Sequence, residues 1–211
     1  MDIAYIITVL VVILLSMTLH EAMHAFAGYW LGDDTARLQG RLTLNPIKHI
    51  DPFLTILLPI LLALTPGAPI FGGAKPVPFN PHNIRYGEWG AALIAVAGPL
   101  TNFVLAFVSF AGFVLVGAHT DTWTGQTLMT ATLVNLGFFV FNMIPIPPLD
   151  GSRVLYALAP EFVRRGMEWI ERYGIMLVFV IVLIGGRFIG AVMQQGIQFF
   201  VSLFARLLGA S

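Results

Sequence analysis

The stretch His20-Glu21-Ala22-Met23-His24 lies inside the first long apolar run of the chain, from Ile3 to Leu31. On a helix, two histidines four positions apart project from the same face. Their imidazoles can bind zinc, and a glutamate between them can act as a general base on a water held there. Such residues are costly in an apolar helix unless they have partners or a function. We therefore interpret the stretch as half of a zinc site, in preference to a pair of hydrogen-bonded core histidines.

The composition places the chain in a membrane. Of its 211 residues, 57% are hydrophobic and 10% are charged, and the mean hydropathy is +0.84. Soluble domains carry about 25% charged residues, so we expect a single integral membrane domain over 1–211, in contact with the lipid bilayer. The first apolar run is too long to be a removable signal peptide. The net charge of zero argues against a nucleic-acid partner. The absence of cysteine excludes disulfides and cysteine-ligated metals.

The pattern of apolar runs predicts an all-α polytopic membrane protein with about four to five transmembrane helices. Prolines after residue 144 end the third of these helices, because proline cannot continue a helix. The amphipathic stretch Ser152–Arg172 is expected to lie at the membrane surface. The C-terminal helices are expected within 169–208, the last as a span or a surface helix. The predicted spans are 3–31, 89–117, 125–147, 169–186 and 188–208.

Residues 33–88 are expected to form a re-entrant segment and a small membrane-associated β-element. The alternation and central glycine of 36–44 predict a short strand or hairpin arm. The prolines of 74–79 predict an extended edge strand. The apolar segment 52–64 is about 13 residues long and contains a proline, which is too short to span a bilayer.

Charge supports this topology. If 52–64 does not cross, then all the loop arginines and lysines before Arg187 lie on one side of the membrane, and 118–124 on the other side carries none. The positive-inside rule makes the charged side cytoplasmic. This arrangement also returns Asp150 to the face of the membrane where His20 and His24 lie.

Two histidines leave zinc short of a third protein ligand. His119 falls on the opposite face and His82 lies in a polar loop, whereas His49 lies on the correct face in a polar segment. Asp150 is the preferred candidate, because it is acidic and follows a broken helix at membrane depth. Its alternative role is that of an N-cap for the helix that begins at Gly151. A set of His20, His24 and Asp150 would leave the fourth position of one zinc ion open for water.

The motifs H-E-x-x-H, Gly98-Pro99-x-x-Asn102 and Asn142-x-x-Pro145-x-x-Pro148-Leu149-Asp150-Gly151 together resemble the site-2 protease family of intramembrane zinc metalloproteases. The stretch Gly40–Pro52 is similar to a compact bacterial branch of that family without a PDZ domain. The resemblance implies zinc on His20, His24 and Asp150, Glu21 as the catalytic base, and contacts of Asn142 and Asn102 with substrate. It also implies regulated cleavage of transmembrane substrates from the cytoplasmic side of a bacterial plasma membrane. The β-element would hold the substrate as a strand.

Two other functions compete with this one. A membrane metal transporter or metal-binding protein would also use intramembrane histidine and aspartate, but it has no need of Glu21 between the histidines. An inactive scaffold that binds membrane helices would not need an intact Glu21 either. The sequence assigns neither a particular substrate nor an oligomeric state.

Overall fold

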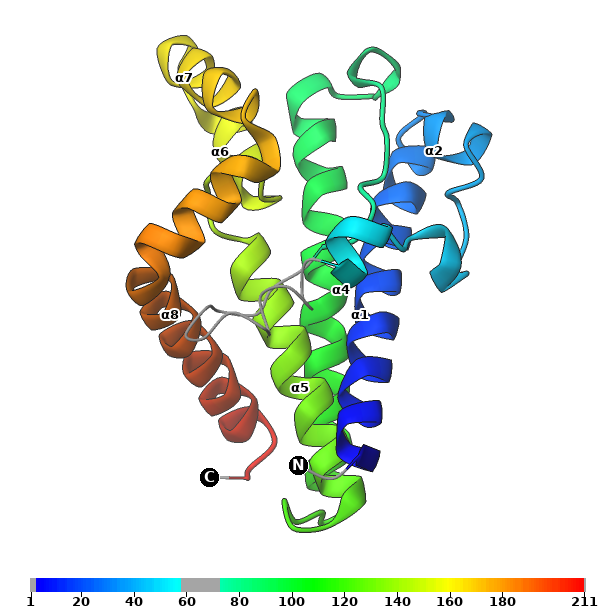
Figure 1. Cartoon of the computed structure of the whole chain (residues 1–211), viewed down its shortest axis with the longest axis vertical. Helices are drawn as coiled ribbons and strands as arrows, with labels where there is room; N and C mark the ends of the chain where they lie inside the picture. Colours follow the sequence, from blue (N-terminus) through cyan, green and yellow to red (C-terminus); the bar gives the residue numbers. More distant parts are fainter. Residues whose placement is uncertain (1–2, 58–72, 211) are drawn as a thin grey trace.

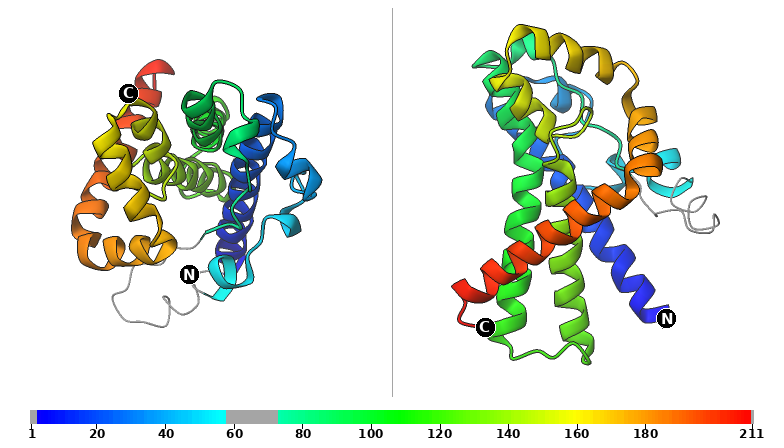
Figure 2. Two further views of the ribbon diagram at one scale, coloured as in Figure 1. Left: turned by 90° about the horizontal axis from the view of Figure 1, so that it is seen from above. Right: turned by 90° about the vertical axis from the view of Figure 1, so that its left-hand side faces the viewer.

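The structure, a computed structural model, describes residues 3–57 and 73–210 and is helical without a strand over that part of the chain. Three long helices pack together as its centre: α1 (Ile3–Trp30), α4 (Gly87–Leu115) and α5 (Trp123–Asn142) (Figure 1). The helix α8 (Gly174–Leu207) crosses this group obliquely (Figure 2). The expected all-α class is therefore confirmed.

Three helices in the described part of the chain are long and apolar enough to cross a membrane: α1, α4 and the Gly185–Leu207 portion of α8. The protein is accordingly a membrane protein. The helix α5, expected as the third span over 125–147, ends at Asn142. Its four threonines, two asparagines and one glutamine make it more polar than α1 and α4. The C-terminal spans expected at 169–186 and 188–208 are replaced by the single helix α8. Gly185 and Gly186 do not break it, because an apolar environment offers the backbone no alternative hydrogen-bond partner.

Aromatic packing joins α4, α5 and α8. The ring of Phe204 on α8 contacts the rings of Phe103, Phe107 and Phe110 on α4. These rings surround Leu136 of α5, whose side chain is fully buried. Contacts of this kind keep α5 against α4, and α5 leads directly to Asp150.

The structure does not contain the strand predicted over 36–44. Instead, Thr35–Leu38 forms the short helix α2. Gly40 adopts a φ of 66°, and the Arg41 N–H donates to the Ala36 carbonyl at 2.8 Å. A glycine in the left-handed region is the common end of a helix, so the glycine that suggested a hairpin is a helix terminator.

The element η2 begins the apolar segment 52–64. The part of that segment beyond residue 57 lies outside the described residues. The expected strand over 74–79 is extended chain without a ladder. The remaining short elements are η1 (Pro46–Lys48), η2 (Pro52–Leu57) and η3 (Pro81–Asn83), followed later by α6 (Gly151–Leu158) and α7 (Glu161–Glu171).

The helices α6 and α7 fold back on each other beside the site. Arg153 forms an ion pair with Glu171, and the Tyr156 hydroxyl donates to Glu168 Oε1 at 2.6 Å. This hydrogen bond to a carboxylate, together with burial, raises the pKa of Tyr156 to about 12. Arg153 follows Asp150 by three residues, so the hairpin helps to hold the start of α6 in place.

Asp33 ties the extended segment to the end of α1. Asp33 is 1% exposed. It accepts from the Thr35 N–H, the Thr35 hydroxyl, the Asn80 N–H at 2.8 Å and the Asn83 amide. Burial alone would raise its pKa, but these hydrogen bonds to the charged form hold the pKa below the ordinary value of 3.8.

Replacing Asp33 with alanine should lower the free energy of unfolding by roughly 2 kcal/mol, because the Asn80 N–H loses its buried acceptor. Thermal unfolding of the detergent-solubilised protein measures this loss. Since the folded pKa is depressed, the difference from wild type should be fully present above pH 3.8 and should shrink as the pH falls below it. The control is Asp34→Ala, which removes a half-exposed carboxylate paired with Arg37. Equal losses in the two variants would contradict the role of Asp33.

Candidate metal centre

His20 and His24 lie on the inner face of α1, and both are buried. The Nδ1 atom of His20 lies 2.5 Å from Asn102 Oδ1 of α4. The Nδ1 atom of His24 lies 2.7 Å from the carbonyl oxygen of Ile94, also on α4. A carbonyl oxygen can only accept, so His24 must carry its proton on Nδ1. Each ring is held by one nitrogen and presents Nε2 to the interior.

Asp150 reaches the same point from the other side of the bundle. The helix α5 ends at Asn142, and the prolines that follow prevent it from continuing. The chain then turns into α6 at Gly151, whose Cα lies so close to Met143 that an added Cβ would sit 2.4 Å from the Met143 carbonyl oxygen. Asp150 occupies the N-cap position, but its side chain makes no capping hydrogen bond. The carboxylate is therefore free to face the two histidines.

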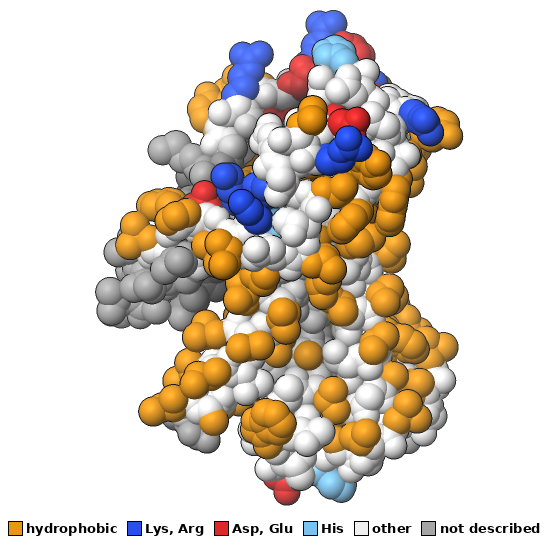
Figure 3. Space-filling view, turned by 90° about the vertical axis from the view of Figure 1, so that its right-hand side faces the viewer, with side chains coloured by type: hydrophobic (Ala, Val, Ile, Leu, Met, Phe, Trp, Pro, Cys, Tyr) orange, Lys and Arg blue, Asp and Glu red, His pale blue; other side chains and the backbone are white. Residues whose placement is uncertain are grey.

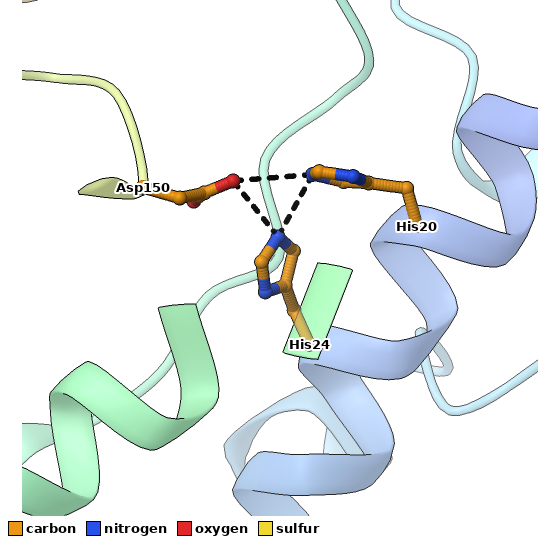
Figure 4. Close-up of side chains that lie close together, drawn as sticks. All are labelled: His20, His24 and Asp150. Carbon is orange, nitrogen blue, oxygen red and sulfur yellow. Dashed lines mark hydrogen bonds and ion pairs between the residues drawn. The ribbon is translucent and has the colours of Figure 1, made fainter. Parts of the chain in front are cut away.

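The three side chains converge on one point (Figure 4). The two Nε2 atoms lie 3.0 Å apart. Asp150 Oδ2 lies 3.2 Å from His20 Nε2 and 3.4 Å from His24 Nε2. A tetrahedral zinc ion with bonds of about 2.0–2.1 Å separates its ligand atoms by roughly 3.3 Å. The spacing of these three atoms fits one zinc ion with an open fourth position.

The chemistry of the donor set supports the same fit. When both histidines are neutral and carry their protons on Nδ1, the two Nε2 lone pairs and the carboxylate oxygen are three acceptors facing each other. A cation placed between the three atoms would stabilise such a group. Gly98 of α4 leaves the room for it, because a Cβ at this position would lie 2.4 Å from His24 Nε2 and 2.7 Å from His20 Nε2.

Glu21 lies next to His20 on α1 and is half-buried. Among the described residues it has no hydrogen bond or ion pair, which leaves its carboxylate available to a water molecule. Its charge acts on Arg41, a residue that is only 4% exposed. Burial lowers the pKa of Arg41, and attraction to the Glu21 carboxylate partly offsets this effect.

The two asparagines expected to contact substrate occupy different surroundings. Asn142 is partly exposed at the end of α5, where its amide donates to the Phe138 carbonyl at 2.9 Å. Asn102 is fully buried and contacts His20. The contacts of Asn102 support a role in holding His20, and a contact of either asparagine with substrate stays a prediction.

The other histidines do not join the group of His20, His24 and Asp150. His49, the alternative ligand on the same face, is fully buried, and its Nε2 lies 2.8 Å from the Thr43 carbonyl oxygen. Its own carbonyl accepts from the Lys75 N–H at 2.9 Å. Arg41 Nη2 donates to the Lys75 carbonyl at 2.6 Å. His49 and Arg41 therefore hold the start of the extended segment.

Sequence reasoning missed two residues at this centre. Gly98 belongs to one of the motifs above, but its closeness to both histidines depends on how α4 packs against α1. Asn135 of α5 was not singled out, although it contacts Asn102. One signal was available for it: Asn135 is a polar residue in an apolar run, seven positions before Asn142 and so on nearly the same helix face.

Comparison with known proteins agrees with this geometry. The model of peptidase family M50 matches residues 117–185. The chain is 37% identical over 206 residues to "Putative zinc metalloprotease YwhC" of Bacillus subtilis (strain 168), and the aligned region covers 93% of this chain and 90% of that protein. It is 31% identical over 185 residues to "Putative zinc metalloprotease Rip2" of Mycobacterium tuberculosis (strain ATCC 25618 / H37Rv), covering 85% of this chain and 69% of that protein. No solved structure matches significantly. The resemblance to site-2 proteases is thus confirmed: the chain belongs to peptidase family M50 and is a metalloprotease.

Proposed function

We propose that this protein is an intramembrane zinc metalloprotease that hydrolyses peptide bonds in or near the transmembrane segments of other membrane proteins. The observation that carries the proposal is the convergence of His20, His24 and Asp150 inside a bundle of apolar helices. A zinc site buried in this way is accessible to a substrate that itself lies in the membrane.

The residues divide the chemistry among them. His20, His24 and Asp150 hold the zinc ion, which when bound supplies Lewis-acid polarisation of the reacting oxygen atoms. Glu21 takes a proton from the attacking water as the new C–O bond forms. It then returns the proton to the amine as the C–N bond breaks. Asn142 is proposed to donate to the oxyanion, which requires its amide to leave the Phe138 carbonyl.

The extended segment 74–79 is the proposed docking edge for an unwound substrate. It is tied at one end by the Lys75 contacts with His49 and Arg41, and at the other end by the Asn80 contact with Asp33. Among the described residues, the backbone of Val77 between these ties has no hydrogen-bond partner. A substrate strand could pair there and recover backbone hydrogen bonds lost when its helix unwinds. Phe79 places the segment beside the site, because its ring packs under Arg153 near Asp150.

The proposed topology has α1, α4 and α5 crossing the bilayer of a bacterial plasma membrane. If α4 crosses, then α5 must return through the membrane for Asp150 to meet His20 and His24. At 20 residues, α5 is about 30 Å long, which is enough. On the face shown in Figure 3, lysine and arginine side chains gather over one end of the molecule. The positive-inside rule makes that end cytoplasmic, so water and substrate would reach the zinc from the cytoplasm.

Labelling of single cysteines tests this topology, and the natural chain has no cysteine to interfere. His82 in η3 and His119 in the loop between α4 and α5 are both exposed. The start of α4 and the α4–α5 loop lie at opposite ends of the bundle (Figure 1). In intact cells, a membrane-impermeant thiol reagent should label His119→Cys but not His82→Cys. In inverted membrane vesicles the pattern should be reversed. Labelling of both variants from the same side would refute the proposed crossing of α4.

Cleavage of a model transmembrane peptide tests the function itself. The purified protein in detergent or vesicles should cut the peptide, a zinc chelator should stop the cutting, and added zinc should restore it. Cleavage that persists at zinc contents near zero would exclude the zinc-dependent mechanism. Stoichiometric zinc without cleavage of any of a panel of transmembrane peptides would favour a metal-binding or scaffold protein.

A further inference from the structure

A chain of buried polar side chains leads from α5 through α4 to the metal centre on α1. Asn135 on α5 accepts, through Oδ1, from Asn102 Nδ2 on α4 at 2.8 Å. Asn102 Oδ1 in turn faces His20 Nδ1 on α1. Asn102 is 0% exposed and Asn135 is 3% exposed. Since neither amide reaches bulk water, each depends on neighbouring protein groups for its hydrogen bonds.

The hydrogen-bond partners determine the orientation of both amides. Asn102 Nδ2 also faces the carbonyl oxygen of Ser16 at 3.3 Å. Two acceptors on this side mean that it must be the NH2 group. The side that faces His20 is therefore the carbonyl oxygen of Asn102, which requires a proton on His20 Nδ1. His20 Nε2 is left with its lone pair directed at the metal position.

Asn135 is needed for this orientation because the Ser16 contact alone is long. The amide of Asn135 is itself fixed, since its Nδ2 donates to the Ala131 carbonyl one turn earlier at 2.8 Å. Its oxygen must then face Asn102. If this oxygen were absent, Asn102 would keep one weak acceptor, and its amide could rotate to present NH2 to His20. That orientation would favour a proton on His20 Nε2, where it would compete with the metal.

We propose that Asn135 is a positioning residue of the metal centre: through Asn102 it fixes the tautomer and ring orientation of His20. The proposal rests on the zinc site proposed above. Partners of this kind behind a ligating histidine typically change metal affinity 10- to 100-fold when they are removed. Asn135 is one step further from the metal, so we expect an effect of about tenfold, at the lower end of this range.

The test compares two variants of Asn135: one should bind zinc more weakly, and the other should be the less stable protein. Asn135→Leu has a similar volume but offers no acceptor to Asn102. Asn135→Asp keeps the acceptor but buries a charge, which should lower the melting temperature of the metal-free protein. Thr132→Val is the control, because Thr132 is fully buried on the same helix and its hydroxyl bonds only its own helix, at the Leu128 carbonyl.

Three quantities are measured on each purified variant: zinc affinity by competition with a chelator, the visible absorption spectrum of the cobalt-substituted protein, and the melting temperature without metal. We expect Asn135→Leu to bind zinc about tenfold more weakly, with an altered cobalt spectrum. Asn135→Asp and Thr132→Val should bind zinc within about threefold of wild type and keep the spectrum. Asn135→Asp should keep this zinc affinity and spectrum although it is the least stable of the three variants.

The outcomes separate this inference from the proposed function. If zinc affinity follows melting temperature across the variants, or if Asn135→Leu binds zinc as wild type does, then Asn135 has only a structural role and the inference is wrong. If the wild-type protein itself fails to bind zinc, then the proposed function fails first.

Discussion

Replacing Glu21 with glutamine is expected to reduce peptide cleavage by about 10²- to 10⁴-fold, the usual contribution of a general base. The side chain keeps its shape but can no longer take a proton from the attacking water. Zinc content should stay at the wild-type value, since Glu21 does not belong to the group of His20, His24 and Asp150. Cleavage is followed on a transmembrane peptide by mass spectrometry, and zinc is measured on the same preparation.

The design of this experiment must separate chemistry from folding. Glu21 attracts the buried guanidinium of Arg41, so removal of its charge is expected to lower the melting temperature slightly. Glu88→Gln is the matched control, because Glu88 is an exposed glutamate in the first turn of α4. It should cleave at the wild-type rate. Undiminished cleavage by Glu21→Gln would refute the assignment of the base. Loss of zinc in this variant would instead make Glu21 part of the metal site.

Gly98→Ala is expected to weaken zinc binding by more than 100-fold, which is greater than the usual effect of removing a hydrogen-bond partner from a ligand. The added methyl carbon would lie 2.4 Å from His24 Nε2 and 2.7 Å from His20 Nε2. At these distances the two rings must move, and the methyl group occupies the space that the zinc ion needs. Chelator competition measures the affinity, and cleavage of the model peptide should be lost in parallel.

Helix stability cannot account for this expected loss. Alanine is more favourable than glycine in a helix interior by about 1 kcal/mol, so α4 itself should not be weakened. Gly112→Ala is the control on the same helix, where the new methyl would meet Leu128 at 3.5 Å, an ordinary contact. It should bind zinc as wild type does. A Gly98→Ala protein with normal zinc affinity would place the metal elsewhere.

Local sequence patterns predicted the three residues that the structure brings together. The four-residue spacing of His20 and His24 puts them on one face of α1 because helix geometry depends only on the local backbone. Asp150 could be paired with them by counting charges across the spans. The pattern over 36–44 misled, because a hairpin arm and the turn after a short helix can both contain a glycine within alternating polar and apolar residues. The left-handed φ of Gly40 and the hydrogen bond from the Arg41 N–H to the Ala36 carbonyl distinguish the two conformations.

Composition and local residue spacing were therefore sufficient to predict that the chain lies in a membrane, which stretches form α1 and α4, and which three residues could hold a metal. These properties depend on composition and on neighbours within one or two helical turns. Helix packing, in contrast, was needed to show that Gly98 leaves space against both histidines, and that Asn102 and Asn135 stand behind His20. It also decided that Asp150 faces the metal position rather than capping α6. These features are contacts between helices far apart in the chain, and they depend on interhelical packing that no local period encodes.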